Sequence, residues 1–262
     1  TRHDIMAVVL AISEQCPKFG GYVHLGATSN DIKDTVLGLQ LIQAKARILE
    51  NIDRVIKNLL KLTEETKSLV CIGRTHGQHA IPMTFGFKFA NFLNEFIIAR
   101  SNLVNTRVNF GKMSGAVGTY ASFGTDEVEK VLLSELGLES LPITTQVISR
   151  TIHSQIIYAL CLVSTVAERF AKEVRNLQRT EINELNEYFS SGQVGSSTMP
   201  QKRNPFRAER ICGISRFIRQ NASSSLENIA LEHERDLTNS SFERLVIPQT
   251  FTLLDFILIE LA

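Results

Sequence analysis

The chain has 262 residues, of which 44% are hydrophobic and 21% are charged. These fractions are ordinary for a soluble globular protein, and they argue against a disordered chain and against membrane spans. Lys and Arg number 28 against 27 Asp and Glu, so the net charge is +1. Because no overall field then favours nucleic acid or a membrane surface, we expect neither as a partner, and any anion site must be local.

The ends of the sequence bear on whether the chain is part of a longer protein, and its cysteines bear on the compartment in which it works. No initiator methionine or targeting segment stands at the start, and the apolar stretch 251–262 stops without a cap, so we expect a piece of a longer protein. The cysteines form no metal-type pair, which predicts reduced thiols in a cytoplasmic protein. They are Cys16, Cys71, Cys161 and Cys212.

The longest predicted element is a helix over residues 31 to about 70, where apolar side chains recur at steps of three and four. At about 1.5 Å per residue it would span roughly 60 Å, so it needs partners of similar length. Such helices are predicted at 84–110, 144–188, 205–231 and from 240 onward, with a shorter one at 125–136 that ends at Gly137.

Loops are predicted at 20–21, 73–82, 111–124 and 190–205, where Gly, Pro, Ser and Thr cluster. No alternating strand pattern of convincing length stands between them, so the predicted class is all-α, a bundle of long helices. Long helices commonly bury their apolar faces against other subunits, which favours an oligomer over the alternative, an extended monomeric coiled coil.

Two of the loop segments carry groups suited to binding or proton transfer. Thr28 and Ser29 precede the long helix and are good N-cap residues, and a helix N-terminus can also bind a carboxylate. His76 and His79 have a spacing that some metal sites use. No acidic or thiol ligand follows nearby, so we expect no metal there.

The segment 190–205 is rich in Gly and Ser and ends in Lys202, Arg203 and Asn204 between two prolines. Such a mobile, donor-rich segment can close over an anion, whereas composition alone also allows a solvated linker. Further on, Ser240 with Glu243 fits a capping box. Because Ser240 and Arg244 share a helix face, we favour an anion site there instead.

The loop G-S-S-T-M-P-Q-K-R-N-P at 195–205 resembles the signature loop of the fumarase/aspartase superfamily. The resemblance implies that Ser196 removes a proton from the carbon beside a carboxylate, and that Lys202 and Asn204 hold the resulting aci-carboxylate. Ser197 and Met199 would contact the substrate. Serine is a poor base unless cations and amide donors stabilise its alkoxide, and fixed donors must also stabilise the doubly negative intermediate.

Two further blocks are similar to the same superfamily. The block T-H-G-Q, followed by a proline, implies that His76 is the general acid that protonates the leaving group, with Thr75 beside the substrate. Histidine suits this role because its reference pKa is about 6.5. The pattern H-x-G-x-T-S implies that Thr28 and Ser29 bind a substrate carboxylate, with His24 next to them.

Other segments resemble the adenylosuccinate lyase branch of the superfamily. They are R-H-D at the start, Q-x-x-S-R at 146–150, and 234–244, which in that branch binds a nucleotide phosphate. Glu209 would act in catalysis by orienting a histidine, either His24 or His76. The substrate-binding residues implied by these segments are Arg2, His3, Asp4, Gln146, Arg150, Arg210, Arg235, Ser240 and Arg244.

The resemblance implies elimination of fumarate from adenylosuccinate, which gives AMP, and from succinylaminoimidazole carboxamide ribotide, without a metal or other cofactor. It also implies a long-helix bundle of the fumarase/aspartase type that assembles into the helical core of a homotetramer, with three subunits at each active site. Residues 1–28 would end an N-terminal domain, 29–262 would form the central bundle, and a C-terminal domain would be absent. The alternatives are argininosuccinate lyase, a carboxymuconate cycloisomerase, and a non-catalytic structural protein on the same fold.

Overall fold

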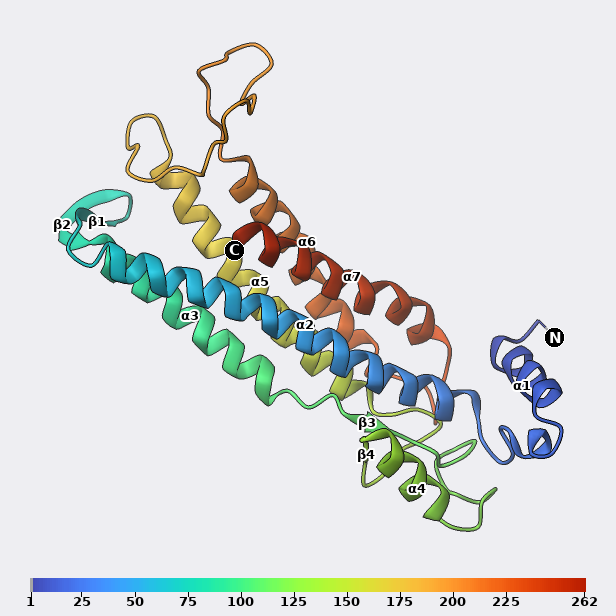
Figure 1. The fold of residues 1–262 in the computed structure, drawn as a ribbon. Coiled ribbons are helices and arrows are strands. Elements are labelled where there is room, and N and C mark those ends of the chain that lie inside the picture. Colours follow the sequence, from blue (N-terminus) through green and yellow to red (C-terminus); the bar gives the residue numbers. More distant parts are fainter. Residues whose placement is uncertain (1) are drawn as a thin grey trace. The chain divides into compact units, whose positions relative to one another are not determined.

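The computed structural model describes residues 2–262, in which long helices predominate (Figure 1). The predicted all-α class is confirmed, because the strands form two short two-stranded sheets. The elements in chain order are α1 (Asp4–Gln15), the 3-10 turn η1 (Gly20–Tyr22), α2 (Ser29–Glu65), β1 (Val70–Thr75), β2 (Gln78–Thr84), α3 (Phe85–Asn105), β3 (Phe110–Gly111), α4 (Glu127–Leu136), β4 (Glu139–Ser140), α5 (Arg150–Leu177), α6 (Phe206–Glu227) and α7 (Thr238–Leu261).

The chain forms two compact units. Unit 1 contains the residues up to Ala44 together with Arg107–His153 and Asn228–Ser241. Unit 2 contains Lys45–Thr106, Ser154–Glu227 and Phe242–Ala262. The domain boundary expected between residues 28 and 29 stays a prediction, and so does the tetrameric core.

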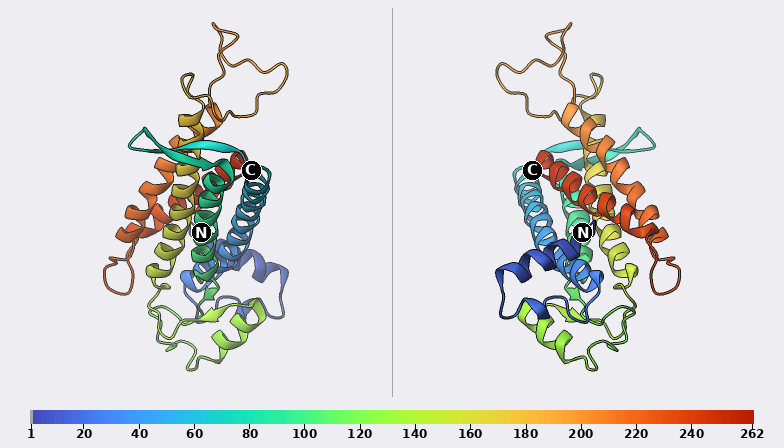
Figure 2. Two further views of the ribbon diagram at one scale, coloured as in Figure 1. Left: turned by 90° about the vertical axis from the view of Figure 1, so that its left-hand side faces the viewer. Right: turned by 90° about the vertical axis from the view of Figure 1, so that its right-hand side faces the viewer.

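Unit 2 is a bundle of helical segments from α2, α3, α5, α6 and α7, which lie side by side in the view of Figure 1 and in the perpendicular views of Figure 2. Each helix contributes apolar side chains that are fully buried, and each of these residues contributes about 1.5–3 kcal/mol through the hydrophobic effect. The periodic apolar face of the sequence is therefore the inner face of the bundle. One such residue from each helix in turn is Ile52, Phe96, Leu160, Ile218 and Leu254.

The segment 70–84 differs from the prediction. The long helix was expected to reach about residue 70 and a loop to follow at 73–82, but α2 ends at Glu65 and β1 and β2 form an antiparallel hairpin. His76 and Gly77 are its two-residue turn, with φ of 53° and 74°. Such turns need positive φ at both positions, which glycine adopts freely. The strands were missed because β2 is exposed along most of its length and lacks an in-and-out pattern.

Unit 1 holds α1, α4, the start of α2 and the short parallel pair β3–β4. The helix α1 was not predicted, because its apolar residues surround the helix and none of its residues 4–15 is buried. The short helix α4 ends before Gly137 as predicted. Other helix ends differ by several residues: α3 ends at Asn105, α5 covers 150–177 instead of 144–188, and α6 ends at Glu227.

Two absences can be stated for residues 2–262. None of their helices combines the length and the apolar character that crossing a bilayer requires. Their His, Cys, Asp and Glu side chains also form no group of three that could hold a metal ion.

Candidate active site

The Ser196 loop, defined as residues 190–205, is the second part of the connection from α5 to α6 and is drawn in orange in Figure 1. Its geometry centres on Ser196, whose Oγ accepts hydrogen bonds from the backbone N–H groups of Thr198 and Met199 at 3.3 and 3.2 Å. The amide of Asn204 donates to the carbonyl of Gly195 at 3.0 Å, so the motif closes on itself. Two amide donors aimed at one hydroxyl oxygen favour the alkoxide that a serine base requires.

A set of hydrogen bonds joins the segment before the Ser196 loop to the end of the loop and the start of α6. The Glu187 carboxylate accepts from the backbone N–H groups of Arg207 and Ala208, at 3.3 and 2.6 Å, in the first turn of α6. The Gln178 side chain accepts from the Glu187 N–H at 3.0 Å and donates to the Arg203 carbonyl at 3.3 Å. These contacts were not foreseen, because the partners are up to 25 residues apart and follow no local motif.

A cavity of about 920 Å³ lies in unit 2 between the end of α5 and the Ser196 loop. Met199, Lys202 and Asn204 line it, as does Glu209 of α6. Cations outnumber carboxylates along its wall, so the local charge suits an anion although the whole chain is nearly neutral. The lining cations are Lys172, Arg175, Arg179, Lys202 and Arg203, and the lining carboxylate is Glu209.

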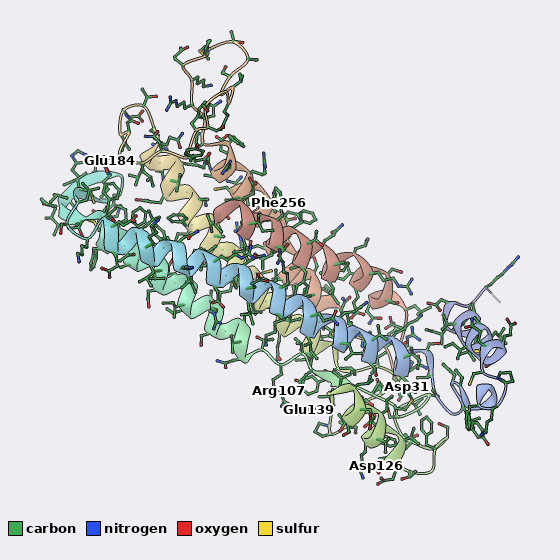
Figure 3. All side chains as sticks on the ribbon, viewed as in Figure 1. Asp31, Arg107, Asp126, Glu139, Glu184 and Phe256 are labelled. Atoms are coloured by element: carbon green, nitrogen blue, oxygen red, sulfur yellow. The ribbon has the colours of Figure 1, made fainter. Side chains whose placement is uncertain are left out.

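The β1–β2 hairpin presents Thr75 and His76 at its exposed tip. Arg74 forms a two-pronged ion pair with Glu184, which follows α5 and is labelled in Figure 3. The hydrogen bond from Arg74 lowers the pKa of Glu184, and the same bond raises the pKa of Arg74. This pair anchors the turn end of the hairpin, because Arg74 pairs with His79 close to the turn. A cavity of about 800 Å³, lined by Arg74 and Gly77, lies beside it in unit 2.

The other predicted residues of unit 2 lie on α6 and α7. Glu209 stands 4.0 Å from Arg175, while Arg210 pairs with Glu260 at 3.1 Å. Arg244 is exposed in the second turn of α7. The orienting role of Glu209 toward a histidine stays a prediction.

In unit 1 the structure brings the R-H-D segment next to the start of α2. His3 Nε2 lies 3.5 Å from the Ser29 hydroxyl, and Asp4 pairs with Lys33 at 2.8 Å. The bond from Lys33, together with the N–H of Ile5, lowers the pKa of Asp4 to about 2. His3 also accepts from the Met6 N–H at 3.3 Å and so caps α1. Arg2, which precedes this cap, is exposed and has a φ of 53°.

The segment 24–31 forms a turn that ends in the N-terminus of α2. Thr28 is the N-cap, because its carbonyl accepts from the Asp31 N–H at 3.0 Å and its own N–H donates to the Asp31 carboxylate at 2.8 Å. His24 has a φ of 68°, and within residues 2–262 its buried Nε2 has no hydrogen-bond partner. Thr28 therefore takes the position just before the helix, as predicted, while capping by its side chain and the carboxylate site stay predictions.

Gln146 and Arg235, two residues far apart in sequence, meet in unit 1. Arg235 donates to Gln146 Oε1 at 2.7 Å, and Gln146 donates to the Ala116 carbonyl at 3.0 Å. Arg150 is buried, and its guanidinium forms an ion pair with Asp34 at 2.8 Å, which is a contact within the fold of unit 1. Its contact with a substrate stays a prediction.

Ser240 does not cap α7, which corrects the capping-box alternative. The helix begins two residues earlier, at Thr238, whose N–H donates to the Asp236 carboxylate at 2.7 Å. The Ser240 side chain is therefore not needed as a cap. Of the predicted phosphate-binding residues, Arg235 and Ser240 belong to unit 1 and Arg244 to unit 2.

Comparison with known proteins gives consistent matches over most of the chain. A family model described as Lyase matches residues 3–219. The chain is 51% identical over 258 residues to adenylosuccinate lyase of Pyrococcus abyssi (strain GE5 / Orsay), covering 97% of this chain and 57% of that protein. It thus spans less than two thirds of the curated relatives it matches.

Solved structures of similar proteins share the fold. Fumarate lyase from Mesorhizobium sp. BNC1 matches with a TM-score of 0.86 and 31% identity, covering 98% of this chain and 58% of that one. The 3-carboxy-cis,cis-muconate lactonizing enzyme from Pseudomonas putida matches with a TM-score of 0.87 and 28% identity, covering 98% and 57%.

Proposed function

Because the chain belongs to the lyase family, we propose that it is the central part of a C–N lyase of purine biosynthesis. The reaction is elimination of fumarate from adenylosuccinate, which leaves AMP, and from succinylaminoimidazole carboxamide ribotide. The observation that carries this proposal is the Ser196 loop, whose amide donors point at the Ser196 oxygen. The substrate assignment is supported by 51% identity to a relative named adenylosuccinate lyase.

Ser196 is the base in this mechanism. Its oxygen takes a proton from the carbon beside a substrate carboxylate, and the electron pair of that C–H bond moves into the carboxylate. The resulting dianion needs fixed positive charge, which Lys202 supplies on the cationic wall of the cavity. Asn204 uses one amide hydrogen to bond Gly195, which leaves the second to donate to the intermediate.

His76 completes the elimination. The C–N bond breaks as the carbon–carbon double bond of fumarate forms, and the electron pair goes to the departing nitrogen. His76, exposed at the hairpin tip, gives that nitrogen a proton. Thr28 and Ser29, at the N-terminus of α2, bind a substrate carboxylate, with His3 and His24 beside them. Arg235, Ser240 and Arg244 bind the phosphate.

We further propose that the whole protein is a cytoplasmic homotetramer, in which three subunits contribute to each active site. Support comes from α3, where apolar side chains remain accessible in the single chain. Apolar side chains that stand exposed along one helix are groups that association of subunits can bury. They are Phe87, Ile97, Ile98 and Val104. Light scattering on the full-length protein tests this assembly, and a monomer at micromolar concentration would contradict it.

The function is tested with an absorbance assay for adenylosuccinate cleavage by the full-length enzyme. Acid–base groups typically contribute about 10²–10⁴-fold to rate, so Ser196→Ala and His76→Ala should both be nearly inactive. Ser240→Ala should mainly raise KM, because a phosphate contact is made in the ground state as well. Equal losses of kcat in all three variants, with KM unchanged, would contradict these roles.

The assay also separates the alternatives. Release of fumarate from argininosuccinate but not from adenylosuccinate would identify the rival lyase, which has no phosphate to bind. Lactone formation from carboxymuconate would identify a carboxymuconate cycloisomerase. A full-length tetramer that eliminates fumarate from neither substrate would indicate a structural protein on this fold.

A further inference from the structure

A glycine-containing loop of unit 1, residues 112–120, is organised around one buried carboxylate. Asp31, labelled at the start of α2 in Figure 3, is fully buried and pairs with Lys112, which is also fully buried. The same carboxylate accepts from the N–H groups of Ser114 and Gly115, both at 3.1 Å, and from that of Thr28 at 2.8 Å. Four donors saturate the acceptor sites of a carboxylate.

A second buried carboxylate holds the same loop from its other side. Glu129 of α4 accepts from the Met113 N–H at 2.7 Å and from the Tyr120 hydroxyl at 2.8 Å. Burial raises the pKa of Tyr120 to about 12, so the hydroxyl keeps its proton and remains a donor. The loop is thus tied at both ends, while Ala116 and Val117 at its tip stay exposed.

The tip of the loop leads directly to the predicted nucleotide site. The Ala116 carbonyl accepts from Gln146, and Gln146 in turn accepts from Arg235. The Asp31 carboxylate therefore contacts Thr28, at the predicted site for a substrate carboxylate, and also Ser114 and Gly115 in the loop whose tip bonds Gln146. These contacts form a continuous path of hydrogen bonds and backbone within unit 1.

Stability alone does not explain this arrangement. Removing two charges from water is costly, and a buried ion pair is often no better for stability than apolar residues of the same volume. What the pair does supply is geometry, because a carboxylate with four fixed donors cannot shift without losing several of them. We propose that Asp31, held by Lys112, is a positioning residue that keeps the Thr28–Ser29 site and the Gln146–Arg235 site in one fixed relation. This inference rests on the proposed function for the identity of the ligands.

The test uses the full-length enzyme with Asp31→Asn, a change that keeps the size of the side chain. Asparagine has one oxygen where the carboxylate has two, and its amide hydrogens would face N–H donors. We expect the dissociation constants of both fumarate and AMP to rise about ten- to hundredfold, the range for losing a hydrogen bond to a charged group.

Two variants show whether the effect is positional. Thr35→Val removes bonds to the N–H and carbonyl of Lys112, at 3.0 and 2.9 Å, without touching Thr28, Ser114 or Gly115. It should lower Tm but leave both dissociation constants unchanged. Glu129→Gln loosens only the loop side, so it should raise the constant for AMP and not that for fumarate. It also keeps the inference testable if Asp31→Asn does not fold.

Amide hydrogen exchange supplies a readout that needs no ligand. Asp31→Asn should deprotect the amides of Thr28, Ser114 and Gly115, whereas Thr35→Val should leave them protected. Wild-type dissociation constants in Asp31→Asn, or a rise for fumarate alone in Glu129→Gln, would overturn the inference. Failure of the wild-type enzyme to cleave adenylosuccinate would instead refute the proposed function, while unchanged exchange in Asp31→Asn would refute the positioning role by itself.

Discussion

Replacing Glu187 by alanine should loosen the Ser196 loop and slow the reaction without removing any group that touches the substrate. The Glu187 carboxylate accepts two backbone N–H groups, those of Arg207 and Ala208, in the first turn of α6. It thus acts as a cap from outside the helix. Gln178 separately joins the Glu187 N–H to the Arg203 carbonyl, and this link uses the Glu187 backbone, so it remains in Glu187→Ala.

The size of the effect follows from these contacts. Loss of an N-terminal cap costs about 0.5–2 kcal/mol, and loss of a negative charge near a helix N-terminus costs about 0.3–1 kcal/mol. Because the two terms overlap and Glu187 is partly exposed, we expect a decrease of about 1–2 kcal/mol in the free energy of unfolding. Misplacement of Ser196 and Lys202 by about 1 Å would lower kcat by up to about 10²-fold, with a smaller change in KM.

The assays are urea unfolding and adenylosuccinate cleavage by the full-length enzyme. Glu181→Ala, which removes an exposed glutamate from the same connection, is the matched control and should change neither quantity. Glu187→Gln can keep the shorter bond to Ala208 and should fall between the wild type and Glu187→Ala. Wild-type stability and kcat in Glu187→Ala would refute the anchoring role.

Three further predictions concern stability. Glu184→Gln should lose about 1–2 kcal/mol at pH 7 by breaking the pair with Arg74. Since Arg74 lowers the pKa of Glu184 below 4.5, the wild-type advantage exists above that pH and should vanish as unfolding is measured at lower pH; an equal difference at pH 3 would contradict it. Phe96→Ala should cost about 3–5 kcal/mol in denaturant unfolding, because the side chain is fully buried, and a loss under 1 kcal/mol would show that the core collapses around it. Gly38→Ala should lower Tm, because the methyl group of the new alanine would collide with the Phe110 carbonyl. An unchanged Tm would contradict this and show that β3 can move aside.

Much of the fold could be predicted from the spacing of apolar residues. A helix buries one stripe whatever lies opposite, so Ile48 and Ile52, four residues apart, already indicated the inner face of α2. The candidate residues of the Ser196 loop could be predicted from the sequence as well, because Ser196, Lys202 and Asn204 lie within nine residues of one another and form a local motif. Local patterns of this kind can be read without knowing what packs against them.

What the tertiary structure decided are the contacts between residues distant in the chain. The bond from Lys112 to Asp31 spans 81 residues, and that from Arg235 to Gln146 spans 89. In the sequence, Asp31 is an ordinary first-turn residue of a helix and Lys112 an ordinary loop lysine. Their burial depends on how unit 1 packs, because only the folded unit removes both charges from water and leaves them each other as partners. The period of the apolar residues therefore determined the helices, and local motifs determined the candidate chemistry. Long-range packing determined which groups hold the helices and the motifs in place.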